Sequence, residues 1–419
     1  MPYTRSQLDA ATRVLELVLA FDRPSDAVLH EYFHANRALG NRDRAFIADT
    51  VYGVLRRMRT VEHLVRNRHP RSMILAWLAR YAGASVRDLA STLSDDEMTR
   101  IAAMKAVSQE EMPFQCTLEL PDWVIDKLRS QVSEADLIAM ARGYFGAAPL
   151  DLRVNTMLAK RDDVLRELAS DNLPALATPY SPVGVRIRGR PAINRHPLFA
   201  RGAVEVQDES SQLLGYLVAP RRNELVIDFC AGAGGKTLHL GALMHSHGRL
   251  YAFDVSAARL ARLKPRLKRS GLSNVHPQVI RNENDLRVKR LTGKVDRVLV
   301  DAPCSGFGTL RRNPDLKWRQ SPESVSELAR KQASILQAAA KLVKPGGRLV
   351  YATCSILAEE NEDIIGRFLD GHPDFKAVPV DELLAQQRIA LDSGSFLKLR
   401  PDVHATDGFF AAALDRVTT

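Results

Sequence analysis

Apolar residues follow a helical period through the first third of the chain. Two sets recur every three or four residues: Ala10, Val14, Leu15, Leu17 and Val18, and then Ile47, Val51, Tyr52, Val54 and Leu55. Strand-like alternation is scarce in this part of the sequence. Pro24, Gly40 and Pro70 interrupt the pattern, as residues at helix ends do. The pattern predicts an all-α domain over residues 1–140.

The pattern changes near residue 141. Residues 149–156 (PLDLRVNT) read as a strand, residues 160–171 (KRDDVLRELASD) as a helix, and residues 184–190 (GVRIRGR) as another strand. A helix within residues 201–220 then leads into the last region. Residues 141–205 are therefore expected to form a small α+β unit that binds RNA or links the larger domains.

Strands and helices alternate from residue 223 onward. Four apolar segments read as strands: ELVIDFC (224–230), RLYAFDV (249–255), DRVLVDAPC (296–304) and GGRLVYATCS (346–355). Helical segments follow the first two, KTLHLGALM and SAARLARLKPRLKRSG. This alternation predicts a parallel sheet with helices on both faces. Ligands of such sheets bind at the carboxyl ends of the strands. We expect residues 206–419 to form this α/β domain.

The composition favours a soluble intracellular protein with a basic surface. The 419 residues include 59 Lys or Arg and 49 Asp or Glu, which gives a formal net charge of +10. No apolar run reaches the roughly 18 residues that a membrane span needs. Asp9 and Glu16 interrupt the stretch where a signal peptide would be apolar. The basic excess favours a polyanionic partner, although a merely skewed surface explains it equally well.

A glycine-rich loop follows the first predicted strand of the α/β domain. It reads DFCAGAGGKT, from Asp228 to Thr237. A phosphate-binding P-loop would need glycine at Cys230, and a dinucleotide loop would need glycine at Thr237. The next strand ends at Asp254, which either accepts hydrogen bonds from ribose hydroxyls or caps the following helix. A glycine loop of neither type, paired with this acid, suits S-adenosylmethionine.

The cysteines occupy unusual places. The chain has four, without a CxxC pair or an HExxH motif, so we expect neither a disulfide framework nor a metal site. Cys304 and Cys354 end neighbouring predicted strands on the ligand side. A thiolate that adds to C6 of cytosine makes C5 nucleophilic enough to accept a methyl group. A second residue is then useful for product release, and a carboxylate beside the base can stabilise the adduct at N3.

Three motifs resemble a known family. DFCAGAGGKT, DAPCSGFGTLRRNPDLKW and VYATCSILAEENE are similar to motifs of the Sun (Fmu) family of RNA cytosine-5 methyltransferases. The N-terminal segment DRAFIADTVYGVLRRMRTVEHL resembles the NusB-like RNA-binding domain of RsmB-type members, which methylate small-subunit (16S) ribosomal RNA. The resemblance covers nearly the whole chain. It implies a class I, Rossmann-like, S-adenosylmethionine-dependent domain, a cytoplasmic monomer and an RNA partner, with no membrane association.

The resemblance also implies roles for single residues. Cys354 matches the nucleophile and Cys304 the cysteine that assists release. Asp301 matches a residue near the cofactor and cytosine N3, and Lys236 a residue close to the target base. The implied cofactor contacts are Cys230, Ala231, Gly232, Ala233, Gly234, Gly235, Lys236, Asp254, Asp285 and Asp301, with Asn284 an alternative to Asp285. The family loop usually reads CAAPGGKT, so Gly232 and Ala233 depart from it; glycine permits the same backbone.

Basic residues surround the predicted site. One set lies on the helix after Asp254, another directly follows Cys304, and a third lies in the middle region: Arg259, Arg262, Lys264, Arg266, Lys268 and Arg269; Arg311, Arg312, Lys317 and Arg319; and Arg153, Arg186, Arg188 and Arg190. The second set is the better candidate for phosphate contacts. Trp318 leaves base stacking open.

Two other functions fit part of these observations. In a DNA cytosine-5 methyltransferase the Pro-Cys cysteine, Cys304, would be the nucleophile, and the second cysteine argues against it. In an RNA-binding assembly factor with a vestigial catalytic domain, both cysteines, Lys236 and Asp301 would have no reason to be present together.

Overall fold

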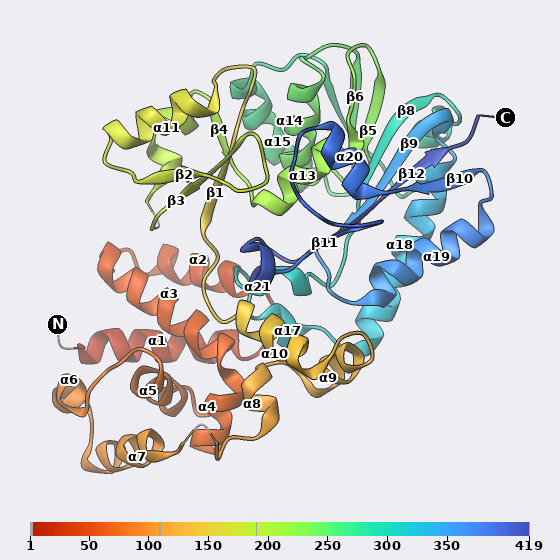
Figure 1. The fold of residues 1–419 in the computed structure, drawn as a ribbon. Coiled ribbons are helices and arrows are strands. Elements are labelled where there is room, and N and C mark those ends of the chain that lie inside the picture. The colour runs from red at the N-terminus through yellow and green to blue at the C-terminus, as the bar shows by residue number, and fades with distance from the viewer. Residues whose placement is uncertain (1–2, 109, 190, 419) are drawn as a thin grey trace. The chain divides into compact units, whose positions relative to one another are not determined.

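The structure, a computed structural model, describes residues 3–108, 110–189 and 191–418 (Figure 1). These residues group into two compact units. We call Met1–Ala147 with Thr309–Pro322 the helical unit, and Ala148–Gly308 with Glu323–Thr419 the sheet unit.

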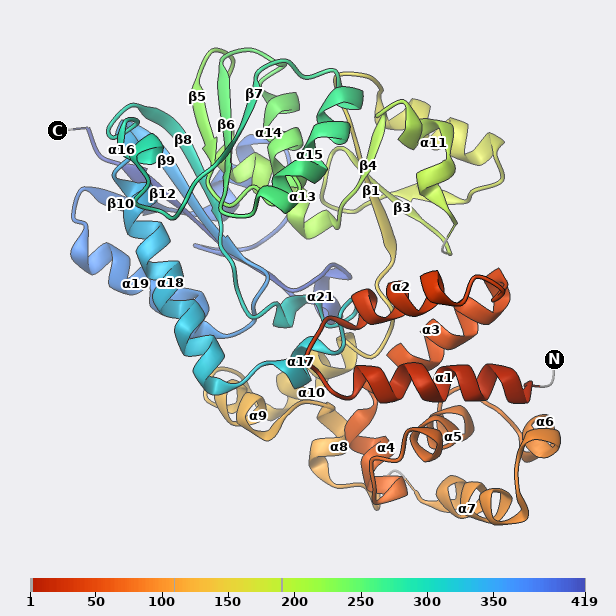
Figure 2. The same cartoon turned by 180° about the vertical axis from the view of Figure 1, so that it is seen from behind.

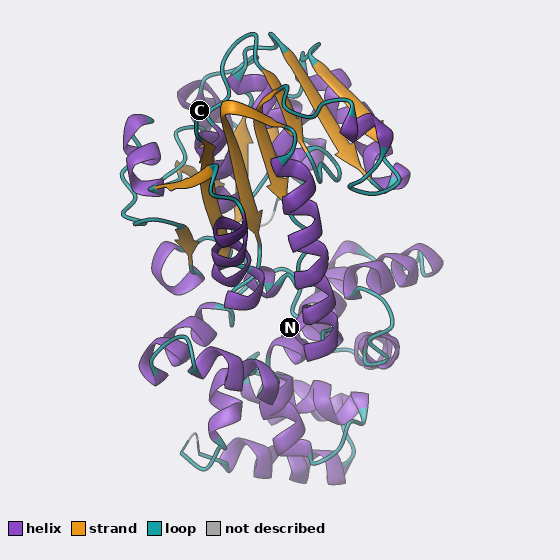
Figure 3. Ribbon diagram, turned by 90° about the vertical axis from the view of Figure 1, so that its right-hand side faces the viewer, coloured by secondary structure: helices purple, strands orange, loops and turns teal. Residues whose placement is uncertain are grey.

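Helices, drawn in purple in Figure 3, build the helical unit. Over residues 3–147 they are α1 (Arg5–Val18), α2 (Ser25–Ala35), α3 (Asn41–Arg56), α4 (Met58–Val65), α5 (Pro70–Arg80), α6 (Val86–Leu89), α7 (Asp95–Ala106), α8 (Phe114–Leu118), α9 (Asp122–Arg129) and α10 (Glu134–Gly143). Thr4 caps α1 by accepting a hydrogen bond from the Gln7 backbone N–H. Val14 and Leu15 are buried, as their spacing predicts, whereas Leu17 is 49% exposed on the outer face.

A short segment from late in the sequence belongs to the helical unit. It includes α17 (Leu316–Arg319). The Lys317 ammonium is buried and donates hydrogen bonds to the carbonyl oxygens of Arg56 at 3.1 Å and of Glu119 at 2.6 Å. Arg56 ends α3 and Glu119 follows α8, so both carbonyls belong to helix ends that need a donor from outside the helix. The prediction that Lys317 contacts RNA phosphates is therefore wrong.

Trp318 also has a structural role. Its indole N–H donates to the carbonyl oxygen of Leu55 at 3.1 Å, and its ring packs against the apolar core of the helical unit. In the same segment Asp315 accepts a hydrogen bond from the Ser25 backbone N–H at 3.2 Å. These contacts hold the segment within the helical unit and take the place of the base stacking that the sequence left open.

A four-stranded antiparallel sheet opens the sheet unit. Its strands are β1 (Leu150–Val154), β2 (Ala175–Ala177), β3 (Gly184–Ile187) and β4 (Val204–Val206), in the order β2-β3-β1-β4. α11 (Arg161–Ser170) packs its buried Val164 and Leu168 on this sheet, and the short α12 (Pro197–Ala200) precedes β4. The sequence predicts β1, α11 and β3, whereas β2 and β4 are too short to show an alternating pattern.

Polar side chains hold the small sheet to the rest of the sheet unit. Asn155 donates a hydrogen bond to the carbonyl oxygen of Ser270 at 2.9 Å. Glu205 on β4 forms ion pairs with Arg266 at 2.8 Å and Arg269 at 2.6 Å, both on α15 (Ala257–Ser270). Arg266 and Arg269, which belong to the basic set on the helix after Asp254, are therefore paired inside the sheet unit.

Two arginines of the middle region are internal as well. Arg153 is 2% exposed and donates to a backbone carbonyl of the glycine-rich loop. Arg186 forms a two-pronged ion pair with Asp151, at 2.7 and 2.8 Å. Of the remaining arginines of this set, Arg188 is exposed and Arg190 lies outside the described residues.

The main sheet is largely parallel. Its strands are β5 (Leu225–Asp228), β6 (Arg249–Asp254), β7 (Val275–Val279), β8 (Val295–Asp301), β9 (Val343–Thr353), β10 (Phe375–Val378), β11 (Leu397–Leu399) and β12 (Phe409–Arg416). The order is β10-β12-β9-β8-β5-β6-β7, with β11 paired to β12, which runs antiparallel to its neighbours. The order reverses between β5 and β8, and such a switch point opens a crevice at the carboxyl ends of the strands.

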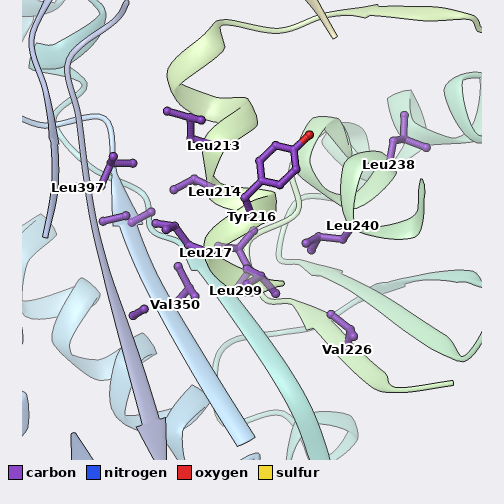
Figure 4. Close-up of a cluster of buried hydrophobic side chains, with 14 of the residues drawn as sticks. Leu213, Leu214, Tyr216, Leu217, Val226, Leu238, Leu240, Leu299, Val350 and Leu397 are labelled. Carbon is purple, nitrogen blue, oxygen red and sulfur yellow. The ribbon is translucent and has the colours of Figure 1, made fainter. Parts of the chain in front are cut away.

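Helices cover both faces of the main sheet (Figures 1 and 2). Alternate strand residues point to opposite faces, as the period of a strand requires, so Val226 and Ile227 belong to different apolar clusters. α13 (Glu209–Val218), α14 (Gly235–Leu243), α15 and α20 (Val380–Gln386) pack on one face, and α16 (Leu286–Lys289), α18 (Pro322–Ala340) and α19 (Glu362–Gly371) on the other. Figure 4 shows the leucines of α13 beside Leu299 and Val350 of the sheet. The short α21 (Pro401–His404) precedes β12.

Within the described part of the chain, every helix is too short or too polar to cross a membrane.

Candidate active site

Most of the predicted site residues converge at the carboxyl ends of β5, β6, β8 and β9, whereas Asp285 follows β7. The glycine loop follows β5, Asp254 ends β6, Asp301 ends β8, and Cys354 follows β9. Three pairs of the predicted residues are in contact: Cys304 with Cys354, Lys236 with Asp301, and Gly232 with Asp254. Residues that are far apart in the sequence thus meet because parallel strands end at one edge of a sheet.

The two cysteines face each other. Their sulfur atoms lie 3.3 Å apart, and both cysteines are free and partly exposed. The backbone N–H of Gly308 donates to the carbonyl oxygen of Cys354 at 2.8 Å, which ties the loop after β8 to the loop after β9. The hydrogen bond with Cys354, together with burial, raises the pKa of the Cys304 thiol well above its usual value.

Lys236 and Asp301 form an ion pair beside the cysteines. The Lys236 ammonium donates to an Asp301 carboxylate oxygen at 2.6 Å and lies 5.3 Å from the centre of the Phe409 ring. Burial acts to lower the pKa of Lys236, but Asp301, with Cys354 and Asp228 nearby, raises it above its usual value. Lys236 therefore places a positive charge near Cys354, the residue that the resemblance implies as nucleophile.

The glycine loop is bonded to Asp254. Gly232 and Gly234 have positive φ angles of 56° and 82°, a backbone shape that favours glycine. The Gly232 backbone N–H donates to one Asp254 oxygen at 2.8 Å, and the Ser256 backbone N–H donates to the other at 2.7 Å. The cap of α15 is Ser256, which accepts from the Arg259 backbone N–H. Asp254 thus supports the glycine loop, and Ser256 caps α15.

Two arginines of the basic sets near the site donate hydrogen bonds to the backbone of this loop. Arg153 donates to the carbonyl oxygen of Gly235 at 2.6 Å, and Arg266 donates to that of Ala233 at 2.7 Å. In the sequence these two arginines look like residues of a charged surface. Only the folded structure shows that they bind the loop.

Two more side chains lie under the loop. Burial raises the pKa of Cys230 and so favours its neutral thiol form. Burial also raises the pKa of Asp228 to about 7, although the Thr237 hydroxyl donates to its carboxylate at 2.6 Å. The other Asp228 oxygen, Oδ1, is buried and has no partner among the described residues. An unpaired carboxylate oxygen beside an open glycine turn fits a cationic ligand with a ribose, and S-adenosylmethionine has both features.

Asp285 starts a helix at the end of the loop after β7. Its two carboxylate oxygens accept hydrogen bonds from the backbone N–H groups of Arg281 at 3.0 Å and Arg287 at 2.9 Å, and these bonds lower its pKa. The backbone N–H of Asn284 donates to the Asn282 side chain at 2.9 Å. Asp285 therefore caps α16. The contact between Asp285 and the adenine, which the resemblance implies, stays a prediction.

The sequence does not indicate that Glu360 belongs to the site. The Glu360 side chain is fully buried and accepts hydrogen bonds from Ser305 and Ser355, the residues that follow the two cysteines. In the sequence Glu360 lies within an acidic run that is typical of a helix start. Nothing in that run distinguishes it from Glu359 or Glu362.

Comparisons with known proteins identify the family. A family model described as 16S rRNA methyltransferase RsmB/F matches residues 215–415, and a ferredoxin-like domain model of RsmF/B-like methyltransferases matches residues 120–194. The probable ribosomal RNA small subunit methyltransferase B of Synechocystis sp. is 34% identical over 412 residues, covering 89% of this chain and 91% of that protein.

Solved structures resemble the fold. The crystal structure of PH0851 is 26% identical with a TM-score of 0.80, and the match covers 99% of this chain and 100% of that one. NSun6 from Pyrococcus horikoshii, solved with SFG, is 20% identical with a TM-score of 0.63, and the match covers 71% of this chain and 99% of that one. The predicted Rossmann-like methyltransferase fold and the family resemblance are both confirmed. The chain belongs to the RsmB/F family of 16S rRNA methyltransferases.

Proposed function

We propose that this protein makes 5-methylcytosine in small-subunit (16S) ribosomal RNA through a covalent adduct between Cys354 and C6 of the base. The observation that carries the proposal is the pair of sulfur atoms 3.3 Å apart at the carboxyl ends of β8 and β9, with the Lys236–Asp301 ion pair beside them. Methylation of an exocyclic amine or an oxygen needs no cysteine nucleophile, whereas attack at C6 needs one.

Cys354 acts first. Its thiolate adds to C6, which places electron density on C5, and C5 then forms a bond to the methyl group. S-adenosylmethionine is the cofactor, and it supplies that methyl group in electrophilic form. The positive charge of Lys236 stabilises the thiolate before the attack. Asp301, which its bond to Lys236 holds in place, is proposed to accept a hydrogen bond from N3 of the base once N3 is protonated in the adduct.

Cys304 acts second. After methylation C5 still carries its proton, which a base must take before the C6–S bond breaks and the Cys354 thiolate leaves. The hydrogen bond to Cys354 is the largest cause of the raised pKa of Cys304. That cause disappears once Cys354 is bonded to carbon, so Cys304 loses its proton more easily. Cys304 is thus held protonated before the adduct forms and is deprotonated more readily when release requires a base.

Replacing the nucleophile tests the mechanism. The variant Cys354→Ala is expected to bind cofactor normally and to transfer no methyl group, as measured with labelled cofactor on ribosomal RNA. Cys116→Ala is the matched control, because Cys116 is a buried cysteine of the helical unit and should leave transfer intact. Full activity of Cys354→Ala would overturn the covalent mechanism.

Replacing the second cysteine tests release. Cys304→Ser is expected to form the adduct but to expel it slowly, so that a protein–RNA species accumulates on a denaturing gel. Rapid turnover without such a species would remove the proposed role of Cys304. The double variant Cys304→Ser/Cys354→Ala should show no adduct.

The substrate is tested directly. RNA should be methylated and DNA of the same sequence should not. Bisulfite sequencing of ribosomal RNA from a deletion strain is expected to reveal one cytosine that loses protection. Residues 1–140, as a NusB-like domain, and residues 141–205 are proposed to bind RNA for the catalytic residues 206–419, in a cytoplasmic monomer.

A further inference from the structure

One buried carboxylate joins the two cysteine loops. Glu360 accepts hydrogen bonds from the backbone N–H of Ser305 at 2.8 Å and from the Ser305 hydroxyl at 2.5 Å. The Ser355 hydroxyl donates to the same carboxylate. Ser305 follows Cys304 and Ser355 follows Cys354, so a single side chain is bonded to the residue next to each reactive sulfur.

A third element completes the cluster. Gln332 of α18 donates one amide hydrogen bond to the Glu360 carboxylate and one to the carbonyl oxygen of Pro303, both at 2.9 Å. The Tyr351 hydroxyl donates to the Glu360 backbone carbonyl at 2.7 Å. A carboxylate offers about four acceptor positions, and here at least four donors reach it. Glu360, Ser305, Ser355, Gln332 and Tyr351 are all buried.

We propose that Glu360 is the positioning residue that fixes Cys304 and Cys354 relative to each other, so that the two sulfurs act on one base in sequence. The inference rests on the proposed function, because it assigns Glu360 a part in that reaction. A buried carboxylate is a costly way to fill space, since an apolar residue of similar volume would stabilise the fold as well or better. The donors that Glu360 recruits come from the two loops that carry the chemistry and from the helix beside them.

The charge of Glu360 has a second effect. The hydrogen bond with Cys354 and burial are the largest causes of the raised pKa of Cys304, and the negative charge of Glu360 raises that pKa further. Glu360 thus favours the protonated form of Cys304.

Two substitutions separate position from charge. In Glu360→Gln the amide oxygen can accept from the Ser305 N–H and from Gln332, and the serine hydroxyls can rotate to accept from the amide NH₂. This variant keeps the bonded frame and removes the charge. Glu360→Ala removes both. Glu362→Ala is the matched control, because Glu362 is a nearby acidic residue that pairs with Lys398 at the surface.

The kinetic test uses the full-length protein and ribosomal RNA. Glu360→Ala is expected to lower kcat about 100-fold, the loss that a misplacement of about 1 Å produces, with KM for RNA unchanged. Glu360→Gln should recover most of that loss, and the acid limb of its kcat–pH profile should shift to lower pH because the pKa of Cys304 falls. Wild-type kcat in a folded Glu360→Ala variant would overturn the proposal.

A second measurement is independent of methyl transfer. Diamide takes up the two hydrogens and two electrons of a thiol pair and leaves a disulfide. The Cys304–Cys354 disulfide should form at least tenfold more slowly in Glu360→Ala than in the wild type or Glu362→Ala, as counted by mass spectrometry. An unchanged rate would contradict the positioning role, and Ser355→Ala, which removes one donor, gives the same test if Glu360→Ala does not fold.

The two proposals fail in different ways. If Cys354→Ala still transfers methyl groups, the covalent mechanism is wrong whatever Glu360 does. If Cys354→Ala is inactive while Glu360→Ala has wild-type kcat and disulfide rate, only the positioning role is wrong.

Discussion

At the scale of single residues, burial decides which groups at the site carry charge. Lys236 stays charged in a buried place because Asp301 is bonded to it, while burial favours the neutral forms of Cys230 and Asp228. Residue types alone predict the chemistry of thiol, amine and carboxylate. They do not reveal the protonation state of each group, because that state depends on solvation and on neighbouring charges.

Asp228 gives a prediction about pH. Its folded-state pKa of about 7 lies above the value of an unfolded aspartate, so the folded chain binds the extra proton. The stabilisation from that proton is complete below about pH 4 and is lost as the pH rises through about 7. Asp228→Asn keeps a neutral side chain at every pH, and its amide oxygen can still accept from Thr237.

The variant Asp228→Asn should therefore melt higher than the wild type at pH 8, while the difference shrinks toward pH 5. The upper limit of the effect is about 4 kcal/mol at pH 8. Thermal unfolding at the two pH values measures it, and Asp392→Asn, at an exposed position, is the control. A difference that does not change between pH 5 and pH 8 would contradict the assignment.

At the scale of elements, the strongest sequence patterns gave the right structure. The long apolar strands β5, β6, β8 and β9 and the helices after β5 and β6 were predictable because each pattern repeats over several residues. Short strands such as β2, β4 and β11 have three residues each and show no period. α17 was missed for a different reason, since its basic residues resemble an RNA contact until their burial is known.

The burial of Lys317 predicts a loss of stability. In Lys317→Met the carbonyl oxygens of Arg56 and Glu119 lose a donor, and each buried carbonyl left without one costs roughly 1–3 kcal/mol. We expect the free energy of unfolding to fall by about 2–4 kcal/mol in urea titrations. Lys331→Met, on the exposed side of α18, is the matched control and should change little. Equal effects of the two substitutions would show that the contacts of Lys317 contribute nothing.

At the scale of the whole molecule, several of the 59 basic side chains are used inside the fold. Arg153, Arg186, Arg266, Arg269 and Lys317 all bind groups of this chain. On α15 the exposed cations are Arg259, which pairs with Asp254, and Arg262, Lys264 and Lys268. The basic surface is therefore smaller than the composition suggests.

Three of these exposed cations, Arg262, Lys264 and Lys268, predict a salt effect. RNA affinity should fall as salt rises, and each phosphate contact contributes a slope of about 0.7–0.9 in a plot of log affinity against log salt. The triple variant Arg262→Ala/Lys264→Ala/Lys268→Ala should lower that slope by up to about 2–3. Arg221→Ala/Arg222→Ala, two exposed arginines before β5, is the control. An unchanged slope in the triple variant would remove α15 from the RNA surface.

The sequence by itself determined the long strands β5, β6, β8 and β9, the helices after the first two, the glycine loop and the cysteine motifs, because each of these is local and leaves a mark in neighbouring residues. Tertiary structure alone decided which distant residues meet: the 3.3 Å contact of the sulfurs, the Glu360 cluster, and the internal use of the arginines. The physical reason is that burial and charge pairing are properties of the folded surface. A lysine on a free face and a lysine inside a helical unit have the same letter in the sequence.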